Sequence, residues 1–274
     1  MNYIELNVPV TSDEQAEVLT ALLADLPFES FLEDSGILKC YIPADSFPAN
    51  KEAADTILAG LGVEGRYIEI EDRNWNELWE SNFEPVEVRG ICTIRAPFHA
   101  PAKTPLEVVI MPKMSFGTGH HATTALMVEA MLCNELRERR VLDVGSGTGV
   151  LAILAAKCGA EAVDAVDTDS WAYENSLENI AANSVEECVI PFLGDISQVE
   201  GNKYEVILAN INLNILLADM ERYLKLLDEG GMLIMSGILQ SDIPALTAEA
   251  QRLGLTPGQT LTRDGWAAAE FHRI

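Results

Sequence analysis

The feature that most constrains the fold is a short apolar segment that runs directly into three alternating glycines. Residues 141–149 read VLDVGSGTG, and an apolar segment of helical length follows from Val150. A strand that ends in such a turn brings backbone N–H groups and a helix N-terminus close to a ligand at the carboxyl edge of a sheet. The dinucleotide fingerprint G-x-G-x-x-G would require a glycine where Val150 stands. The turn therefore predicts an α/β domain and disfavours a dinucleotide ligand.

The C-terminal part of the chain alternates strand and helix patterns. Strands are expected at residues 141–144, 162–167, 189–193, 204–209 and 232–237, and helices at 150–158, 170–182 and 213–227. Shorter strands are expected before them, at 92–95 and 106–111. Such alternation predicts a mostly parallel sheet with helices on both faces. Residues 266–273 are expected to close this sheet as a candidate antiparallel strand.

The first 71 residues have a different pattern, βαββαβ. Strands are expected at residues 3–8, 28–32, 37–42 and 67–70, and helices at 12–26 and 50–61. This order is the split βαβ arrangement of a ferredoxin-like domain. Ser12 can cap the first helix, and Pro27 can stop it. We therefore expect a small α+β domain at 1–71 and a larger α/β domain at 91–274.

Residues 72–90, between these domains, carry three large aromatic side chains. Trp75, Trp79 and Phe83 follow one another at a spacing of four. A helix would place all three rings on one face. We expect a packed helical linker here, and a row of aromatic side chains that grips a substrate is the alternative.

The charge of the chain is strongly negative. Against 43 Asp and Glu there are 18 Lys and Arg, which gives a formal net charge of −25. Residues 1–60 alone hold eleven acids and two lysines. Such a surface repels a phosphate backbone, so no direct nucleic-acid partner is expected. An acidic surface attracts cations and favours a basic partner, with plain solubility as the alternative reason for the charge.

Cysteine spacing and hydropathy indicate the compartment. The five cysteines form no CxxC pair, and no apolar run approaches the ~18 residues of a membrane span. The first residues lack the basic start of a signal peptide. We therefore expect a cytoplasmic protein with reduced thiols. His120 and His121 lack the spacing of a zinc site, so no metal is expected.

The arrangement D-x-G-x-G-x-G at Asp143–Gly149 resembles the first motif of the Rossmann-like methyltransferases that use S-adenosylmethionine. Asp167 lies 22 residues beyond Gly145, at the end of the next expected strand. A carboxylate there can accept hydrogen bonds from both hydroxyls of a ribose. The alternatives are a structural turn for the glycines and a helix cap for Asp167.

Two further expected strands end in polar side chains. Asp195 lies where similar methyltransferases contact the adenine amino group, although a turn or a helix cap is the alternative. Asn210 has a carboxamide oxygen that can accept a hydrogen bond from an amine and aim the amine's lone pair at a methyl group. The alternative is that Asn210 or Asn212 caps the helix at 213–227.

A second glycine loop, MSFGTGHHATT at residues 114–124, precedes a helix expected at 125–137. Its Gly-Thr-Gly turn and Phe116 can fold over a bound cofactor. Thr123 or Thr124 can cap the helix, and an ordinary capped loop is the alternative.

Taken together, these segments point to one family. The stretches MSFGTGHHATT, VLDVGSGTGVLAI, VDTD, ANI and LIMSGIL occur in one order and at compatible spacing. They resemble the PrmA family, the methyltransferases of the eleventh large-subunit ribosomal protein. The resemblance covers residues 72–274 and implies a Rossmann-like class I methyltransferase domain. It also implies a small N-terminal domain that captures the substrate protein.

The resemblance implies a set of cofactor-binding residues from both glycine loops and two strand ends. These residues are Phe116, Gly117, Thr124, Gly145, Gly147, Asp167 and Asn210. In the family pattern Asp167 holds the ribose of S-adenosyl-L-methionine, and Asn210 faces the methyl group and the incoming amine. His121 also lies above the cofactor and is a candidate general base, so Asn210 and His121 are the expected catalytic residues.

The implied activity is methylation of lysine side chains and of the N-terminal amine of a basic ribosomal protein of the large subunit. We expect a monomer that acts by direct in-line transfer. The alternatives are a methyltransferase for another protein or a small-molecule amine, a non-catalytic cofactor-binding module and an NAD-dependent oxidoreductase.

Overall fold

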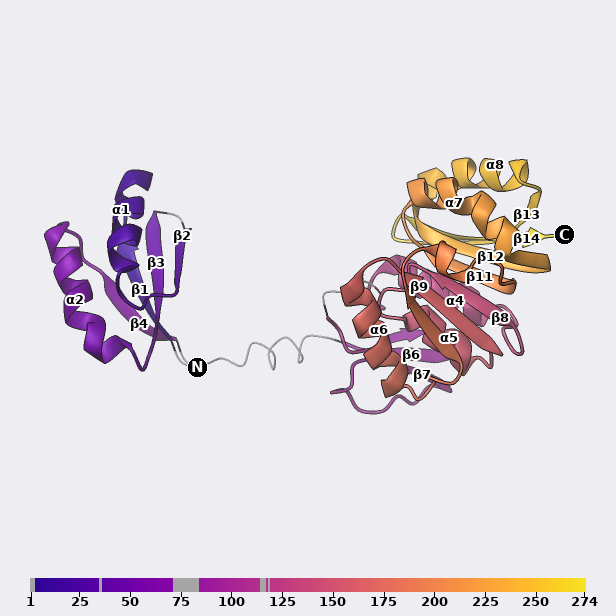
Figure 1. Ribbon diagram of the computed structural model, residues 1–274, viewed down its shortest axis with the longest axis horizontal. Coiled ribbons are helices and arrows are strands. Elements are labelled where there is room, and N and C mark those ends of the chain that lie inside the picture. The colour runs from indigo at the N-terminus through magenta and orange to yellow at the C-terminus, as the bar shows by residue number, and fades with distance from the viewer. Residues whose placement is uncertain (1–2, 35, 71–83, 114–116, 118) are drawn as a thin grey trace. The chain divides into compact units, whose positions relative to one another are not determined.

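The structure is a computed structural model that describes residues 3–34, 36–70, 84–113, 117 and 119–274. The chain divides into two compact units, Met1–Phe83 and Glu84–Ile274, which Figure 1 shows. The helix expected around Trp75, Trp79 and Phe83 lies outside the described residues. The end of the expected linker is not helical, because Val86–Val88 form strand β5 of the second unit.

The first unit is a four-stranded antiparallel sheet with two helices packed against one face. Its elements are β1 (Tyr3–Pro9), α1 (Asp13–Leu23), β2 (Ser30–Asp34), β3 (Ile37–Pro43), α2 (Phe47–Gly60) and β4 (Arg66–Ile70), and its strand order is β2-β3-β1-β4. Alternate residues of β1, Ile4, Leu6 and Val8, share a core cluster with Leu19 of α1 and Leu58 of α2. The period of two along β1 therefore directs one face of the sheet to the helices.

The second unit is built on a seven-stranded sheet ordered β10-β9-β8-β11-β12-β14-β13. The strands are β8 (Arg140–Val144), β9 (Ala162–Asp167), β10 (Val189–Leu193), β11 (Tyr204–Asn210), β12 (Leu227–Leu239), β13 (Leu255–Arg263) and β14 (Trp266–Arg273). Strands β8 to β12 run parallel, whereas β14 is antiparallel to both of its neighbours. The carboxyl ends of the five parallel strands therefore meet at one edge, and the closing strand is antiparallel.

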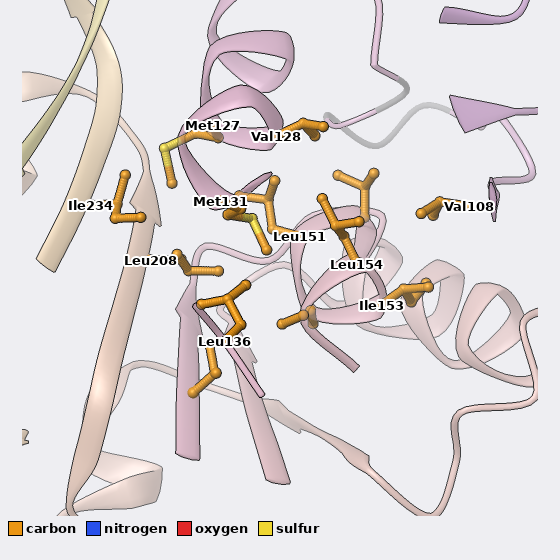
Figure 2. Packing of buried hydrophobic residues seen from close by; sticks show 14 of the residues in the cluster. Val108, Met127, Val128, Met131, Leu136, Leu151, Ile153, Leu154, Leu208 and Ile234 are labelled. Atoms are coloured by element: carbon orange, nitrogen blue, oxygen red, sulfur yellow. The ribbon is translucent and has the colours of Figure 1, made fainter. Parts of the chain in front are cut away.

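Helices cover both faces of this sheet, as the alternating pattern predicts. They are α4 (Ala122–Leu132), α5 (Val150–Lys157), α6 (Ser170–Ala182), η1 (Ile196–Val199), α7 (Leu213–Leu226), η2 (Gln240–Asp242) and α8 (Ile243–Arg252). One core cluster includes α4, α5 and α6, and the other includes η1, α7 and α8. Figure 2 shows the first cluster, where Met127, Met131 and Leu151 of the helices lie beside Leu208 and Ile234 of the sheet. Burial of each such side chain contributes roughly 1.5–3 kcal/mol.

A smaller sheet joins β5 to β6 (Cys92–Arg95) and β7 (Leu106–Val109), just before the second glycine loop. Strand β6 pairs antiparallel with β5 and parallel with β7. Buried Ile94 and Val108 belong to the core cluster that includes α4 and α5. The small sheet is thereby packed onto the helices that follow both glycine loops.

The structure adds α8 and β13, for which the sequence pattern predicts no element. In α8 only Leu246 and Ala250 are buried, and in β13 only Leu255 is buried. Such sparse burial gives no clear helical or strand period. None of the helices in the described part of the chain is long and apolar enough to span a membrane.

Candidate functional site

The first glycine loop connects β8 to α5 at the carboxyl edge of the sheet. The N–H groups of Gly145 and Ser146 donate to the carbonyl oxygen of Val166 at 2.9 and 3.1 Å. The φ angles of Gly145, Gly147 and Gly149 are 69°, 55° and 80°. Residues with side chains rarely adopt such positive angles, so this loop requires glycine at each position.

Gly145 also lies directly against Ile211, the first residue after β11. A Cβ on Gly145 would come 2.5 Å from Cγ2 of Ile211. The contact leaves no room for a side chain, so glycine at position 145 lets the loop pack closely against the end of β11.

We expect Gly145→Ala to lower the free energy of unfolding by about 2–4 kcal/mol, because steric overlap adds to backbone strain. Gly201→Ala is the matched control: Gly201 has a φ of 91°, but a Cβ there meets nothing within 4 Å. Gly201→Ala should lower the free energy of unfolding by only about 1 kcal/mol. Thermal and denaturant unfolding measure both variants, and equal losses would contradict the role of the Ile211 contact.

Asp167, the last residue of β9, is tied to the glycine loop. Its Oδ2 accepts a hydrogen bond from the N–H of Gly147 at 2.8 Å, and its Oδ1 accepts one from Asp169 at 2.9 Å. The cap of α6 is Asp169, whose Oδ1 accepts from the N–H of Trp171 at 2.7 Å. Each oxygen of Asp167 keeps a further lone pair. The carboxylate thus presents two fixed acceptors that suit a pair of hydroxyl groups.

A cavity of about 140 Å³ opens beside Asp167. Gly145 and Gly194 line it together with Ile211 and Ile215, which form an apolar wall. The two isoleucines could not be identified from the sequence, because an apolar residue next to a strand end carries no chemical signal. The cavity combines apolar surface with the carboxylate, as sites for small ligands usually do.

Asp195 lines the same cavity and caps η1. Its Oδ1 accepts from the N–H of Ser197 at 3.0 Å, and its Oδ2 accepts from the guanidinium of Arg222 at 3.2 Å. Hydrogen bonds from the hydroxyl and the N–H of Ser197, followed by Arg222, lower the pKa of Asp195 below its usual value. The structure therefore shows Asp195 as a helix cap, which is one of the two roles expected for it.

The second glycine loop lies against the first. The hydroxyl of Thr148 donates to the carbonyl oxygen of Gly117 at 2.8 Å. Gly117 has a φ of 108°, and a Cβ there would come 2.7 Å from the Thr148 hydroxyl. The close approach of the two loops therefore requires glycine at position 117. Phe116, expected in the same loop, lies outside the described residues.

His121 caps α4. Its Nδ1 accepts from the N–H of Thr123 at 3.3 Å, and its ring packs edge-on against Trp266 with 4.8 Å between centroids. The expectation that Thr123 or Thr124 caps this helix is wrong, because the imidazole nitrogen accepts that hydrogen bond. Thr124 is fully buried in α4, and its hydroxyl has no hydrogen-bond partner among the described residues.

Asn210 is the last residue of β11 and directly precedes Ile211 of the cavity wall. It does not cap α7, because Oδ1 of Asn212 accepts from the N–H of Ile215 at 3.2 Å. The Oδ1 of Asn210 is buried and finds no hydrogen-bond partner in the part of the chain that the structure describes. An unpaired buried acceptor costs about 1–3 kcal/mol, so this oxygen is suited to a ligand N–H.

Asp143 is a buried carboxyl group to which the sequence analysis gives no separate role, although it begins the first glycine motif. Its Oδ2 accepts from the N–H of Ala152 at 3.1 Å, and its Oδ1 has no partner within the described ranges. Burial, with a smaller contribution from the charge of Asp167, raises the pKa of Asp143 to about 7, against the lowering effect of the hydrogen bond from Ala152. Burial beneath the loop therefore disfavours the charged form of this carboxyl group.

Four of the expected site residues thus meet at one edge of the sheet. Gly145 and Asp167 line the cavity, Gly147 donates to Asp167, and Asn210 adjoins the cavity through Ile211. The edge offers two acceptors for hydroxyl groups and one for an amine. This combination can hold a ribose-bearing cofactor beside an amine acceptor.

Comparisons with known proteins give a family. A family model described as Ribosomal protein L11 methyltransferase (PrmA) matches residues 3–273. A protein named ribosomal protein L11 methyltransferase from Porphyromonas gingivalis is 44% identical over 270 residues, which cover 96% of this chain and 92% of that protein. A protein of the same name from Chlorobaculum tepidum is 36% identical over 281 residues, covering 98% and 96%.

Solved structures share the fold. The crystal structure of a ribosomal protein L11 methylase from Lactobacillus delbrueckii subsp. bulgaricus matches with a TM-score of 0.64 and 24% identity, covering 70% of this chain and 99% of that chain. A 16S rRNA N2 G1207 methyltransferase from T. Thermophilus, in complex with AdoMet and guanosine, matches with a TM-score of 0.50 and 20% identity, covering 58% and 45%. The likeness confirms the predicted Rossmann-like class I methyltransferase fold.

Proposed function

The chain belongs to the PrmA family of ribosomal protein L11 methyltransferases, and from this premise we propose that it transfers methyl groups from S-adenosyl-L-methionine to ribosomal protein L11. The acceptors are lysine side chains and the N-terminal amine. The observation that carries the proposal is the buried Oδ1 of Asn210, which finds no partner among the described residues and belongs to the neighbour of Ile211 in the wall of the cavity that Gly145 and Asp167 line. It gives an amine acceptor a hydrogen-bond partner next to a ribose site.

The described residues fit this cofactor. Asp167 would hold the ribose, since each of its carboxylate oxygens keeps a lone pair for a hydroxyl group. Gly145 and Gly147 let the backbone approach a ligand closely, and Thr124 offers a buried hydroxyl that has no partner within the described residues. When bound, S-adenosylmethionine supplies an electrophilic methyl group on its sulfonium sulfur.

Asn210 would orient the acceptor amine for attack. A lysine amine has a pKa near 10.4 in water, and only its neutral form has a lone pair to offer. Burial of the amine beside the cavity lowers that pKa, because desolvation disfavours the charged form. The Oδ1 of Asn210 accepts one amine N–H and thereby fixes the direction of the lone pair.

His121 would support this site by capping α4. Its Nδ1 accepts from the N–H of Thr123 at 3.3 Å and lies 2.8 Å from the hydroxyl of the same residue. We therefore assign His121 to holding α4 in place, with the amine proton leaving to solvent.

We also propose a division of labour within the chain. Residues 1–71 capture the substrate protein, residues 72–90 link the two domains, and residues 91–274 catalyse methyl transfer. The acidity of residues 1–60, with eleven acids and two lysines, supports capture of a basic protein by charge complementarity. The net charge of −25 supports action on L11 without direct contact to nucleic acid. We further propose that the protein works as a cytoplasmic monomer.

Mass spectrometry of purified L11 after incubation with the protein and S-adenosylmethionine tests the proposal. We expect mass gains in whole-methyl steps on lysines or the N-terminal amine. L11 with acetylated amines is the control and should gain no mass. Binding of S-adenosylmethionine without any mass gain on L11 would contradict the proposed substrate. Preferential binding of NAD in calorimetry would contradict the proposed cofactor.

A further inference from the structure

Three buried asparagines share one face of α6 and its end. Asn175, Asn179 and Asn183, the asparagine row, follow one another at a spacing of four and are 1%, 0% and 8% exposed. Asparagine is a poor helix former, and burial of an amide costs free energy unless the amide is hydrogen-bonded. The partners of the row therefore indicate what these side chains hold in place.

Two members of the asparagine row, Asn179 and Asn183, pair with the extended segment that starts in β7, which lies beside α6 in Figure 1. Asn183 accepts from the N–H of Val109 at 2.9 Å and donates to its carbonyl oxygen at 2.6 Å. Asn179 accepts from the N–H of Met111 at 2.8 Å. Two residues of a strand span ~6.7 Å and four residues of a helix span ~6 Å, so row and segment stay in register. The segment that leads into the second glycine loop is thereby fixed to α6.

Asn179 binds the first glycine loop as well. Its Nδ2 donates to the carbonyl oxygen of Thr148 at 2.9 Å and to Oδ1 of Asn175 at 3.2 Å. Thr148 in turn donates through its hydroxyl to Gly117 of the second loop at 2.8 Å. The reversed orientation of the Asn179 amide would oppose donor to donor at Met111 and acceptor to acceptor at Thr148. One side chain thus joins the approach to the second loop with the body of the first.

We propose that Asn179 is a positioning residue for methyl transfer, which sets the separation of the two glycine loops around the cofactor. This inference rests on the proposed function. Asn179 is fully buried and is not among the residues that line the cavity beside Asp167, so it acts through Met111 and Thr148.

Asn183 provides a matched control one helical turn away. Its side chain also makes three hydrogen bonds, but they reach only Val109 and the carbonyl oxygen of Asn179. It therefore fixes the same segment to α6, and among the described residues it makes no direct hydrogen bond to either glycine loop.

The test compares Asn179→Ala with Asn183→Ala. We expect Asn179→Ala to raise the Kd of S-adenosylhomocysteine and the KM for the cofactor about tenfold, as loss of a buried hydrogen-bond partner typically does. Both variants should lower Tm by a similar amount, but Asn183→Ala should change the Kd of S-adenosylhomocysteine by less than about twofold. Calorimetry, thermal unfolding and kinetics give these values. Lower Tm in both variants with unchanged Kd would mean a merely structural role and would overturn the inference.

Thr148→Val is a second variant that does not depend on the folding of Asn179→Ala. It removes the hydroxyl that binds Gly117 and keeps the shape of the side chain. We expect Thr148→Val to raise the Kd about tenfold as well. In the double variant Asn179→Ala/Thr148→Val the two effects should not add, because both residues act through one link. Unchanged Kd, or additive effects, would overturn the inference. Failure of the wild-type protein to bind S-adenosylhomocysteine would overturn the proposed function and this inference with it.

Discussion

Asn210→Ala is expected to lower kcat for methyl transfer to L11 by about 100-fold or more, while the Kd of S-adenosylmethionine changes by less than about threefold. The variant removes the buried Oδ1 that finds no partner among the described residues and that would orient the amine. Loss of such alignment raises the barrier of the chemical step rather than weakening the bound cofactor. Steady-state kinetics and calorimetry measure the two effects separately.

Asn212→Ala is the control for this prediction. Asn212 lies two residues away and caps α7, so its loss should cost about 1 kcal/mol of stability and leave kcat unchanged. Equal losses of kcat and of cofactor affinity in Asn210→Ala would contradict the assigned role.

Asp167→Ala is expected to weaken S-adenosylmethionine binding by about 100-fold or more. Two charge-assisted hydrogen bonds to ribose hydroxyls would be lost, and each is worth about 1.5–3 kcal/mol. The variant also removes the acceptor that holds Gly147 at 2.8 Å. Calorimetric titration of the cofactor measures the change.

Asp169→Ala is the matched variant from the same loop. It removes the cap of α6, the hydrogen bond to the N–H of Trp171, but leaves the carboxylate of Asp167 in place. We expect about 1 kcal/mol of lost stability and a Kd within about threefold of wild type. An equal loss of affinity in both variants would show that Asp167 does not hold the ribose.

The parts of the fold with strong local signals could be predicted from the sequence. Helix α6 and strands β10 and β14 have the expected bounds, because turn or cap residues stand next to their ends. The first glycine loop could be predicted for a similar reason: alternating glycines directly after a strand have few other uses. Its positive φ angles confirm that physical requirement.

Other parts depend on contacts between distant residues. Asn210 and Asn212 have the same side chain near one helix start, and only the path of the backbone decides which of them caps α7. Propensity favours threonine over histidine as the cap of α4, but His121 packs against Trp266, 145 positions along the chain. The hydrogen bonds of Asn179 and Asn183 reach 68 and 74 positions along the chain, so no local pattern reveals them.

A crystal structure of the protein with S-adenosylhomocysteine tests the central claim most directly. We expect both ribose hydroxyls at about 3 Å from the carboxylate oxygens of Asp167. We also expect Oδ1 of Asn210 to face the sulfur atom across the space where the acceptor amine would lie. A ligand bound away from the first glycine loop, or an Asn210 side chain turned from the sulfur, would contradict it.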